Sequence, residues 1–219
     1  MGDAVDFSSP AVGSDGRICV GSGDNNLYTL NSIGTLVWSY TTVNDIKSSP
    51  AINLDDGICV GSNDKNVYYF SSTGSFLWSY FIGTNAADIA ESSPAIGDNG
   101  TIYVQARLKL LALNSTGSLL WSFSTAGAGA ASHSSPALWT NGQIYDGASN
   151  SKILYSINSN CSLVWSYLTN GTLESSPVIT SDGRAYIGSI DKNIYAFTHT
   201  GSLIWSYLTT HKVYSSPAI

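Results

Sequence analysis

Charge is scarce in this sequence, and its scarcity narrows the possible functions. Only 11% of the 219 residues are charged, and nine basic against fifteen acidic residues leave a net charge of −6. Such a chain has no basic field with which to attract a phosphate backbone, so a nucleic-acid partner is excluded. The sequence also lacks any run of about 18 consecutive apolar residues, so no membrane-spanning helix is expected.

Cysteines are few, and a leader segment is not recognisable. The three cysteines form neither a Cys-x-x-Cys pair nor an even-numbered disulfide framework, so they predict no disulfide and no metal site. The first six residues contain no basic segment and no apolar run, so no signal peptide is expected there. Sequons at Asn114, Asn160 and Asn170 are compatible with an extracytoplasmic location, but a chain rich in Ser, Thr and Asn produces such triplets by chance.

The feature that the sequence has in abundance is a tandem repeat of about 40 residues. Ser-Ser-Pro recurs six times, with its proline at positions 10, 50, 94, 136, 177 and 217. A Trp-Ser-aromatic triplet recurs five times, beginning at Trp38, Trp78, Trp121, Trp165 and Trp205. The chain therefore contains five full copies of the repeat and the first residues of a sixth.

Each copy divides into four short strands, as the fifth copy shows. Strands are expected over 175–179, 184–189, 193–197 and 203–207, with turns between them that contain Asp or Gly. Four antiparallel strands per repeat predict an all-β fold, a β-propeller of about five four-stranded blades in a single domain. The expected blades cover 7–46, 47–90, 91–132, 133–173 and 174–213, and residues 214–219 are expected to add an extra inner strand.

The strand, polar turn, glycine and tryptophan of each copy resemble the repeat of pyrroloquinoline-quinone (PQQ) type propellers. The resemblance is clearest from Ala112 to Trp121, which read Ala-Leu-Asn-Ser-Thr-Gly-Ser-Leu-Leu-Trp, and it extends over nearly the whole chain. In that family the tryptophan packs flat between neighbouring blades, which implies a structural role for the five repeated tryptophans. The turn is one residue shorter than in the dehydrogenase form. The chain is therefore more similar to the broad PQQ-like repeat proteins, such as the outer-membrane assembly lipoprotein, than to the enzymes.

The resemblance does not extend to the residues that serve catalysis in quinoprotein dehydrogenases. Those enzymes use a larger, eight-bladed ring, a calcium held by carboxylates, a catalytic Asp beside the quinone and often a disulfide of adjacent cysteines. None of these features can be placed in this sequence, and no Ser/His/Asp arrangement or paired-histidine motif occurs. We therefore expect no catalysis and no quinone, metal or other cofactor.

Differences between the copies indicate a candidate binding face. The connection from each Trp to the next Ser-Ser and the turn between the second and third strands both vary, and in an up-and-down blade both emerge on the same face. The residue before each Ser-Ser varies on that face, at the mouth of the central channel. The candidate binding residues at this mouth are Lys47, Glu91, His133, Glu174 and Tyr214, and Phe7 holds the same position in the first copy. The alternative is that these positions vary because they are solvent-exposed.

Three other groups of residues are interpreted as structural. Asp-x-Asn turns such as Asp24 and Asn26 are expected to cap themselves, because calcium would need further acidic ligands. Cys19 and Cys59 occupy equivalent strand positions and are expected to be buried. Trp139 lies outside the repeat position and is expected to be the one exposed tryptophan.

The sequence thus predicts a non-catalytic binding or protein-interaction scaffold. The alternative is a carbohydrate-binding, lectin-like propeller, so the expected partner at the variable face is a protein or a glycan. The strand at 214–219 is redundant in a ring of five blades. Because an unpaired strand tends to find a partner, it is expected either to enter the first blade or to pair outside its own ring. In the second case it begins a further blade, supplied by another chain through self-association or by native sequence beyond these 219 residues.

Overall fold

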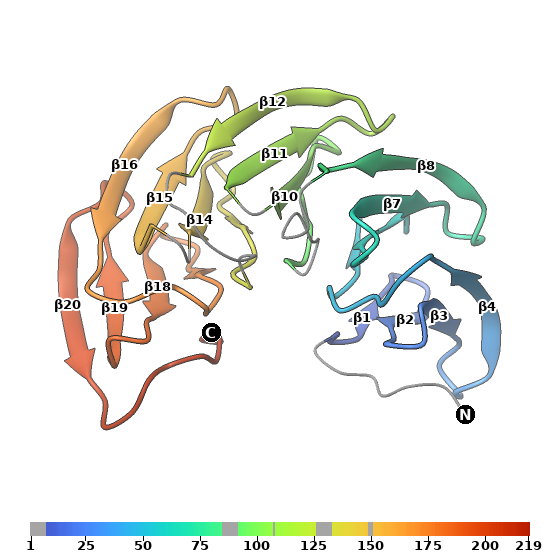
Figure 1. Cartoon of the computed structure of the whole chain (residues 1–219), viewed down its shortest axis with the longest axis horizontal. Helices are drawn as coiled ribbons and strands as arrows, with labels where there is room; N and C mark the ends of the chain where they lie inside the picture. Colours follow the sequence, from blue (N-terminus) through green and yellow to red (C-terminus); the bar gives the residue numbers. More distant parts are fainter. Residues whose placement is uncertain (1–7, 85–91, 107, 126–132, 149–150) are drawn as a thin grey trace.

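The computed structural model describes residues 8–84, 92–106, 108–125, 133–148 and 151–219. These residues form twenty β-strands in five four-stranded antiparallel sheets, and each sheet keeps its strands in chain order. The predicted all-β propeller with five blades is therefore confirmed. Figure 1 shows the blades side by side along an arc, with the first strand of each blade toward the centre and the fourth on the outside. The described part contains no helix, and hence none that could cross a membrane.

The strands of the five blades have the following bounds. Blade 1 consists of β1 (Ala11–Val12), β2 (Ile18–Gly21), β3 (Asn26–Leu30) and β4 (Leu36–Thr41). Blade 2 consists of β5 (Ala51–Ile52), β6 (Ile58–Gly61), β7 (Asn66–Phe70) and β8 (Phe76–Phe81). Blade 3 consists of β9 (Ala95–Ile96), β10 (Ile102–Ala106), β11 (Lys109–Leu113) and β12 (Leu119–Ser124). Blade 4 consists of β13 (Ala137–Leu138), β14 (Ile144–Ala148), β15 (Ile153–Ile157) and β16 (Leu163–Leu168). Blade 5 consists of β17 (Val178–Ile179), β18 (Ala185–Gly188), β19 (Asn193–Phe197) and β20 (Leu203–Leu208).

Neighbouring blades are joined by the repeated tryptophans. Trp78 of blade 2 lies against the turn between β11 and β12 of blade 3, and its Nε1 donates a hydrogen bond to Ser115 O at 2.9 Å. Gly117 in that turn has a φ of +81°, and a Cβ at this position would lie 2.6 Å from the Trp78 ring. Glycine suits both the left-handed backbone and the close approach of the ring, although blade 4 has Cys161, with a φ of 71°, at the equivalent position. Trp121 and Trp165 make the same Nε1 hydrogen bond to the next blade, at 2.8 and 2.9 Å.

The space between blades is filled by four apolar clusters, one at each seam. The seam of blades 1 and 2 shows the pattern, since Leu27 of β3 packs with Val60 of β6 and Phe70 of β7, and all three are fully buried. Because successive residues of a strand point to opposite faces, each blade contributes one set of residues to the seam before it and another to the seam after it. The propeller core is therefore a series of similar seams and not one central core.

The two ends of the arc differ from its interior. Blade 1 and blade 5 lie at opposite ends of the arc and are not packed together in Figure 1. Residues 214–219 belong to none of the twenty strands, so the extra inner strand expected there is not formed. A physical reason is that an inner strand is defined by pairing with the second strand of its own hairpin, and residues 214–219 pair with none of the twenty described strands. The inner place of blade 1 is held by β1, which pairs with β2.

The expectation that Trp139 is the exposed tryptophan is wrong. Trp139 is only partly exposed, its Nε1 donates to Ser181 O at 3.2 Å, and its ring lies against Gly183 of blade 5. It therefore joins blades 4 and 5 on the opposite face from the mouth, as a second docking contact beside Trp165. The tryptophan that is exposed is instead Trp205, with 44% of its surface accessible.

Candidate functional site

A cavity of about 670 Å³ lies where the inner ends of the blades converge. All its lining residues come from the Ser-Ser-Pro segments or from the residue directly before them. They are Ser9, Lys47, Ser49, Ser93, His133, Ser135, Glu174, Ser176, Tyr214 and Ser216. The volume falls within the range of ordinary small-ligand sites.

The floor of this mouth is built by the second serine of each Ser-Ser pair. The backbone N–H of Ser9 donates to Ser49 Oγ, that of Ser49 to Ser93 Oγ and that of Ser93 to Ser135 Oγ, each at 2.9 Å. The same bond continues from Ser135 to Ser176 at 2.9 Å and from Ser176 to Ser216 at 3.0 Å. We call this series the serine ladder. Each hydroxyl in it keeps its own proton and a second lone pair, with which it can bind a group in the cavity.

The first serine of the pair is buried in all five blades, and in blades 1, 2 and 5 it holds the inner segment to the second strand. Gly21 N donates to Ser8 Oγ at 3.0 Å, Gly61 N to Ser48 Oγ at 2.8 Å and Gly188 N to Ser175 Oγ at 3.2 Å. This bond satisfies a backbone N–H of the second strand beyond the two residues that pair with the short first strand. The Ser-Ser-Pro motif therefore anchors one serine in the blade and presents the other to the mouth.

Charge at the mouth is concentrated in a histidine–carboxylate pair. His133 Nδ1 lies 2.8 Å from Glu174 Oε2, and Thr172 Oγ1 donates to Glu174 Oε1 at 3.1 Å. The hydrogen bond from His133 in particular lowers the pKa of the Glu174 carboxyl, although its partial burial acts in the opposite direction. Glu174 is therefore held as a carboxylate that faces solvent beside the serine ladder.

Four of the five residues predicted for the mouth lie around this one cavity. They are Lys47, His133, Glu174 and Tyr214, and Tyr214 is 60% exposed. Glu91 and the corresponding Phe7 lie outside the residues that the structure describes. The second serines are constant in all six copies, so differences between the copies do not reveal them.

The Asp-x-Asn turns are the residues considered for calcium binding. Their aspartate oxygens accept hydrogen bonds from the same turn and from the strand that follows it. Asp64 Oδ1 accepts hydrogen bonds from Asn66 N and Nδ2, both at 3.0 Å, and Asp64 Oδ2 accepts one from the Tyr68 hydroxyl at 2.7 Å. Asp24 and Asp191 make the same contacts with their own tyrosines. The three carboxylates therefore each fix the turn before a third strand. Among the described residues, no group of three His, Cys, Asp or Glu side chains is placed to share a metal ion.

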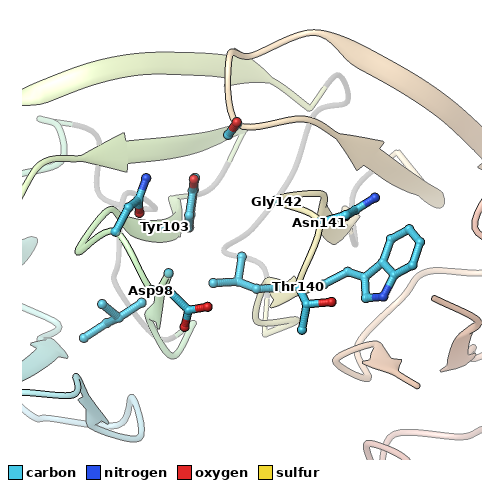
Figure 2. A pocket seen from close by; sticks show the side chains of 11 residues that line it. Asp98, Tyr103, Thr140, Asn141 and Gly142 are labelled. Carbon is cyan, nitrogen blue, oxygen red and sulfur yellow. The ribbon is translucent and has the colours of Figure 1, made fainter. Parts of the chain in front are cut away.

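A second, smaller hollow of about 360 Å³ lies between blades 3 and 4. Figure 2 shows Asp98 and Tyr103 of blade 3 on one side of it and Thr140, Asn141 and Gly142 of blade 4 on the other. It is formed by the turns between first and second strands, which belong to the face opposite the mouth. Only blades 3 and 4 line this hollow, whereas residues from the inner segments of all five blades line the mouth.

One buried polar pair at the seam of blades 3 and 4 was not anticipated from the sequence. Asp146 of β14 is fully buried at a position where the other copies have Val or Ile, and burial raises the pKa of its carboxyl to about 7. In the orientation that satisfies its hydrogen bonds, the Gln105 amide nitrogen lies 3.0 Å from Asp146 Oδ2, and the Gln105 oxygen accepts from Thr125 Oγ1 at 3.3 Å. Within the described part, Asp146 Oδ1 has no hydrogen-bond partner. Comparing the copies position by position would have found both departures.

Blades of this repeat, joined by tryptophan and lined at the mouth by Ser-Ser-Pro, define a PQQ-like repeat β-propeller. The family model described as outer membrane protein assembly factor BamB matches residues 5–158 and 115–218, and the chain belongs to this family. The resemblance to PQQ-like repeat proteins is thereby confirmed. A comparison with curated proteins finds no match.

Two solved structures share the fold at low sequence identity. The structure of BamB from Moraxella catarrhalis superposes with a TM-score of 0.76 at 15% identity, over 98% of this chain and 67% of that one. A streptogramin B lyase structure superposes with a TM-score of 0.76 at 16% identity, over 96% of this chain and 70% of that one. One of these names describes an assembly factor and the other an enzyme, so the fold is shared by both kinds of protein.

Proposed function

We propose that the chain is a non-catalytic protein-interaction propeller that holds an extended polypeptide segment at the channel mouth. The observation that carries this proposal is the serine ladder within a cavity of about 670 Å³. An extended peptide presents alternating N–H and C=O groups, and serine hydroxyls can accept from the first and donate to the second. Lys47 and the Glu174 carboxylate add one charge of each sign at the rim. The family's description as an assembly factor supports a protein partner at the level of the family.

Binding to an array of immobilised peptides tests this proposal. The purified chain should bind a subset of extended peptides, and Lys47→Ala and Glu174→Gln should each weaken that binding by about tenfold, because rim charges fix the register of a bound segment. Asp98→Asn is the matched control, since Asp98 lies in the hollow on the opposite face. Absence of peptide binding, or equal binding by the mouth variants, would contradict the proposal. Binding to a glycan array that the same mouth variants lose would favour the lectin alternative instead.

The proposal that no reaction occurs at the mouth has its own support. The matching family model is described as an assembly factor, which supports a non-catalytic role at the level of the family. Streptogramin B, the compound named with one structural neighbour, is a first substrate to test. Incubation with the chain should leave it intact. Consumption that depends on His133, shown by its loss in His133→Ala, would overturn the non-catalytic assignment.

A further inference from the structure

Trp139 of blade 4 fills a place at the seam with blade 5, on the face opposite the mouth. Its Nε1 donates to Ser181 O at 3.2 Å, and a Cβ on Gly183 would lie 2.5 Å from its ring. The ring of His199 lies beside it, with the two centroids 5.5 Å apart. We call these three residues of blade 5 the ring seat. Its occupant is an indole that donates one hydrogen bond to a backbone carbonyl.

Blade 4 has a ring seat of its own at the seam with blade 3. The three seat positions are held there by Thr140, Gly142 and Ser159. Gly142 has a φ of +88°, close to the +81° of Gly183, and the N–H of each glycine donates to the carbonyl three residues earlier at 2.9 Å. The two hairpins also pair their strands in the same register. The backbone of the second seat therefore has the same form as that of the first.

No ring of blade 3 enters this second seat, because blade 3 has Gly97 at the position of Trp139. A Cβ on Gly142 would meet only Ser159, with the Oγ at 3.8 Å. The space left is the hollow of about 360 Å³, which Gly97 and all three seat residues line. Its lining residues belong to the described part of the chain and lie in the interior of the arc, so neither end of the chain contributes to it (Figure 2).

We propose that this hollow is a binding site for a flat aromatic ring with an N–H donor, of which indole is the model. The ring lies over Gly142, and its N–H donates to Thr140 O, as Trp139 donates in the next seam. Ile96, Leu138 and Tyr103 add apolar surface for the carbon atoms of the ring. The site is separate from the mouth, and it does not depend on the function proposed there.

The hollow also selects among the substituents of such a ring. Asp98 is exposed and lies on the blade 3 side of the hollow, across from Thr140 (Figure 2). A carboxylate at the rim repels an anionic substituent and attracts a cationic one. The ligand class is therefore a neutral or cationic indole-like ring, which either a small molecule or a tryptophan side chain of another polypeptide supplies.

Titration of the isotope-labelled chain with indole, followed by the NMR shifts of its backbone amides, tests the site. Saturable shifts should appear at Gly142 and Ser159 with a dissociation constant in the millimolar range, as a ligand of about nine non-hydrogen atoms allows. Benzofuran, which has an oxygen in place of the N–H, should bind at least about threefold more weakly, because it gives Thr140 O no donor. Absence of saturable shifts at Gly142, or equal binding of benzofuran, overturns the proposal.

Gly97→Trp supplies from blade 3 the ring that Trp139 supplies from blade 4. The variant should fold, because Asn99 Oδ1 beside this position accepts from Thr101 N at 3.0 Å and the equivalent bond beside Trp139 is 2.9 Å long. It should lose indole binding and melt about 2 to 4 °C higher, since the new ring fills the hollow. Gly97→Ala is the matched control and should retain binding within about twofold. Binding that persists in Gly97→Trp contradicts the site.

Trp139→Gly empties the occupied seat and provides a positive control. It should fold, because blade 3 has a glycine at this position, and it should bind indole with shifts at Gly183. Binding at Gly183 in this variant without binding at Gly142 in the wild type would show that the two seats differ, which overturns the proposal.

Two pairs of ligands then define what the hollow accepts. Tryptamine should bind about two- to fivefold more tightly than indole-3-acetate, and Asp98→Asn should abolish that difference. Equal binding of the two by the wild type contradicts the role of Asp98. N-acetyltryptophanamide carries the indole as a polypeptide does. Binding of this compound at the affinity of indole assigns the site to a tryptophan side chain, whereas binding of free indole alone assigns it to a small molecule.

Discussion

Strands β16 and β20 have almost the same sequence and opposite environments. They read Leu-Val-Trp-Ser-Tyr-Leu and Leu-Ile-Trp-Ser-Tyr-Leu, yet Trp165 donates to His199 O of the next blade at 2.9 Å whereas Trp205 is 44% exposed. The comparison shows that burial in a repeat protein is decided by the neighbouring repeat and not by the local sequence. The same tryptophan is packed against the next blade in one copy and exposed in another.

The largest change in stability should come from truncating the buried tryptophan of this pair, and truncating the exposed one should have a much smaller effect. Trp165→Ala removes a ring packed between blades 4 and 5 and should lower the free energy of unfolding by about 3 to 5 kcal/mol. Trp205→Ala removes an exposed ring and should lower it by less than about 1 kcal/mol at concentrations where the chain is monomeric. Chemical denaturation of both variants measures the difference. Equal losses would show that Trp205 is covered within the monomer.

The seam of blades 3 and 4 contains the buried Asp146, whereas the equivalent positions of the other copies are apolar. The free energy of unfolding should therefore depend on pH through this seam. The pKa of Asp146 is raised to about 7 from a usual 3.8, so the native state binds the proton more tightly than the unfolded chain, and stability falls as the pH rises from about 4 to about 7. Asp146→Asn has no carboxyl to titrate at this position, so it lacks this pH-dependent loss of stability. Relative to the wild type it should gain about 2 to 3 kcal/mol between about pH 5 and about pH 8, as two pH units of linkage imply.

Thermal unfolding of the wild type and Asp146→Asn at both pH values measures this gain. Val104, which occupies the equivalent position in blade 3, provides a control, since Val104→Ala should lose stability equally at both pH values. A constant difference between the wild type and Asp146→Asn across the pH range would show that the carboxyl is not retained in its neutral form.

Gly201 and Gly34 have similar backbone conformations, but only Gly201 has a docked tryptophan against it. Alanine substitution at the two positions therefore measures the contribution of the docked ring. Gly201 and Gly34 have φ values of +87° and +80°, but a Cβ on Gly201 would lie 2.6 Å from Trp165 while one on Gly34 would meet nothing within 4 Å. Alanine at either position strains the backbone by about 1 kcal/mol. Gly201→Ala should cost about 1 to 3 kcal/mol more, because the docked ring must move. Denaturant titrations that give equal losses would contradict the docking geometry of Trp165.

The smallest effect concerns the mouth. The hydrogen bond from His133 lowers the pKa of Glu174, so this carboxylate stabilises the native state above its unfolded-state pKa, and the contribution is lost as the pH falls through its native-state pKa. Glu174→Gln should remove that acid sensitivity at a cost below about 1 kcal/mol, since His133 is 59% exposed and solvent screens the pair. The acid limb of the stability curve measures it, and a limb unchanged in Glu174→Gln would contradict the assignment.

The repeated features of the fold could be predicted from the sequence, and the exceptions could not. Alternating strands, Gly turns and Ser-Ser-Pro segments recur often enough to predict five four-stranded blades, and the variable residue before Ser-Ser located Lys47, His133, Glu174 and Tyr214 at one cavity. The exposure of Trp205 could not be predicted, because its repeat is identical in pattern to those in the interior. For the same reason the segment at 214–219 was expected to be a strand, although pairing requires a partner that the sequence pattern alone does not supply.

The serine ladder also determines the geometry of the whole arc. Each blade is a wedge, narrow at the ladder, where adjacent segments are linked by one hydrogen bond of 2.9 to 3.0 Å, and wide at the outside, where a tryptophan ring is the spacer. The difference between the two spacings sets the angle from one blade to the next, and this angle sets how many blades complete a full turn. The inner link is the same at all five steps, so it constrains the angle between blades in the same way along the whole arc. A change of the residues at either rim should therefore alter the angle between blades while leaving the strands of each blade intact.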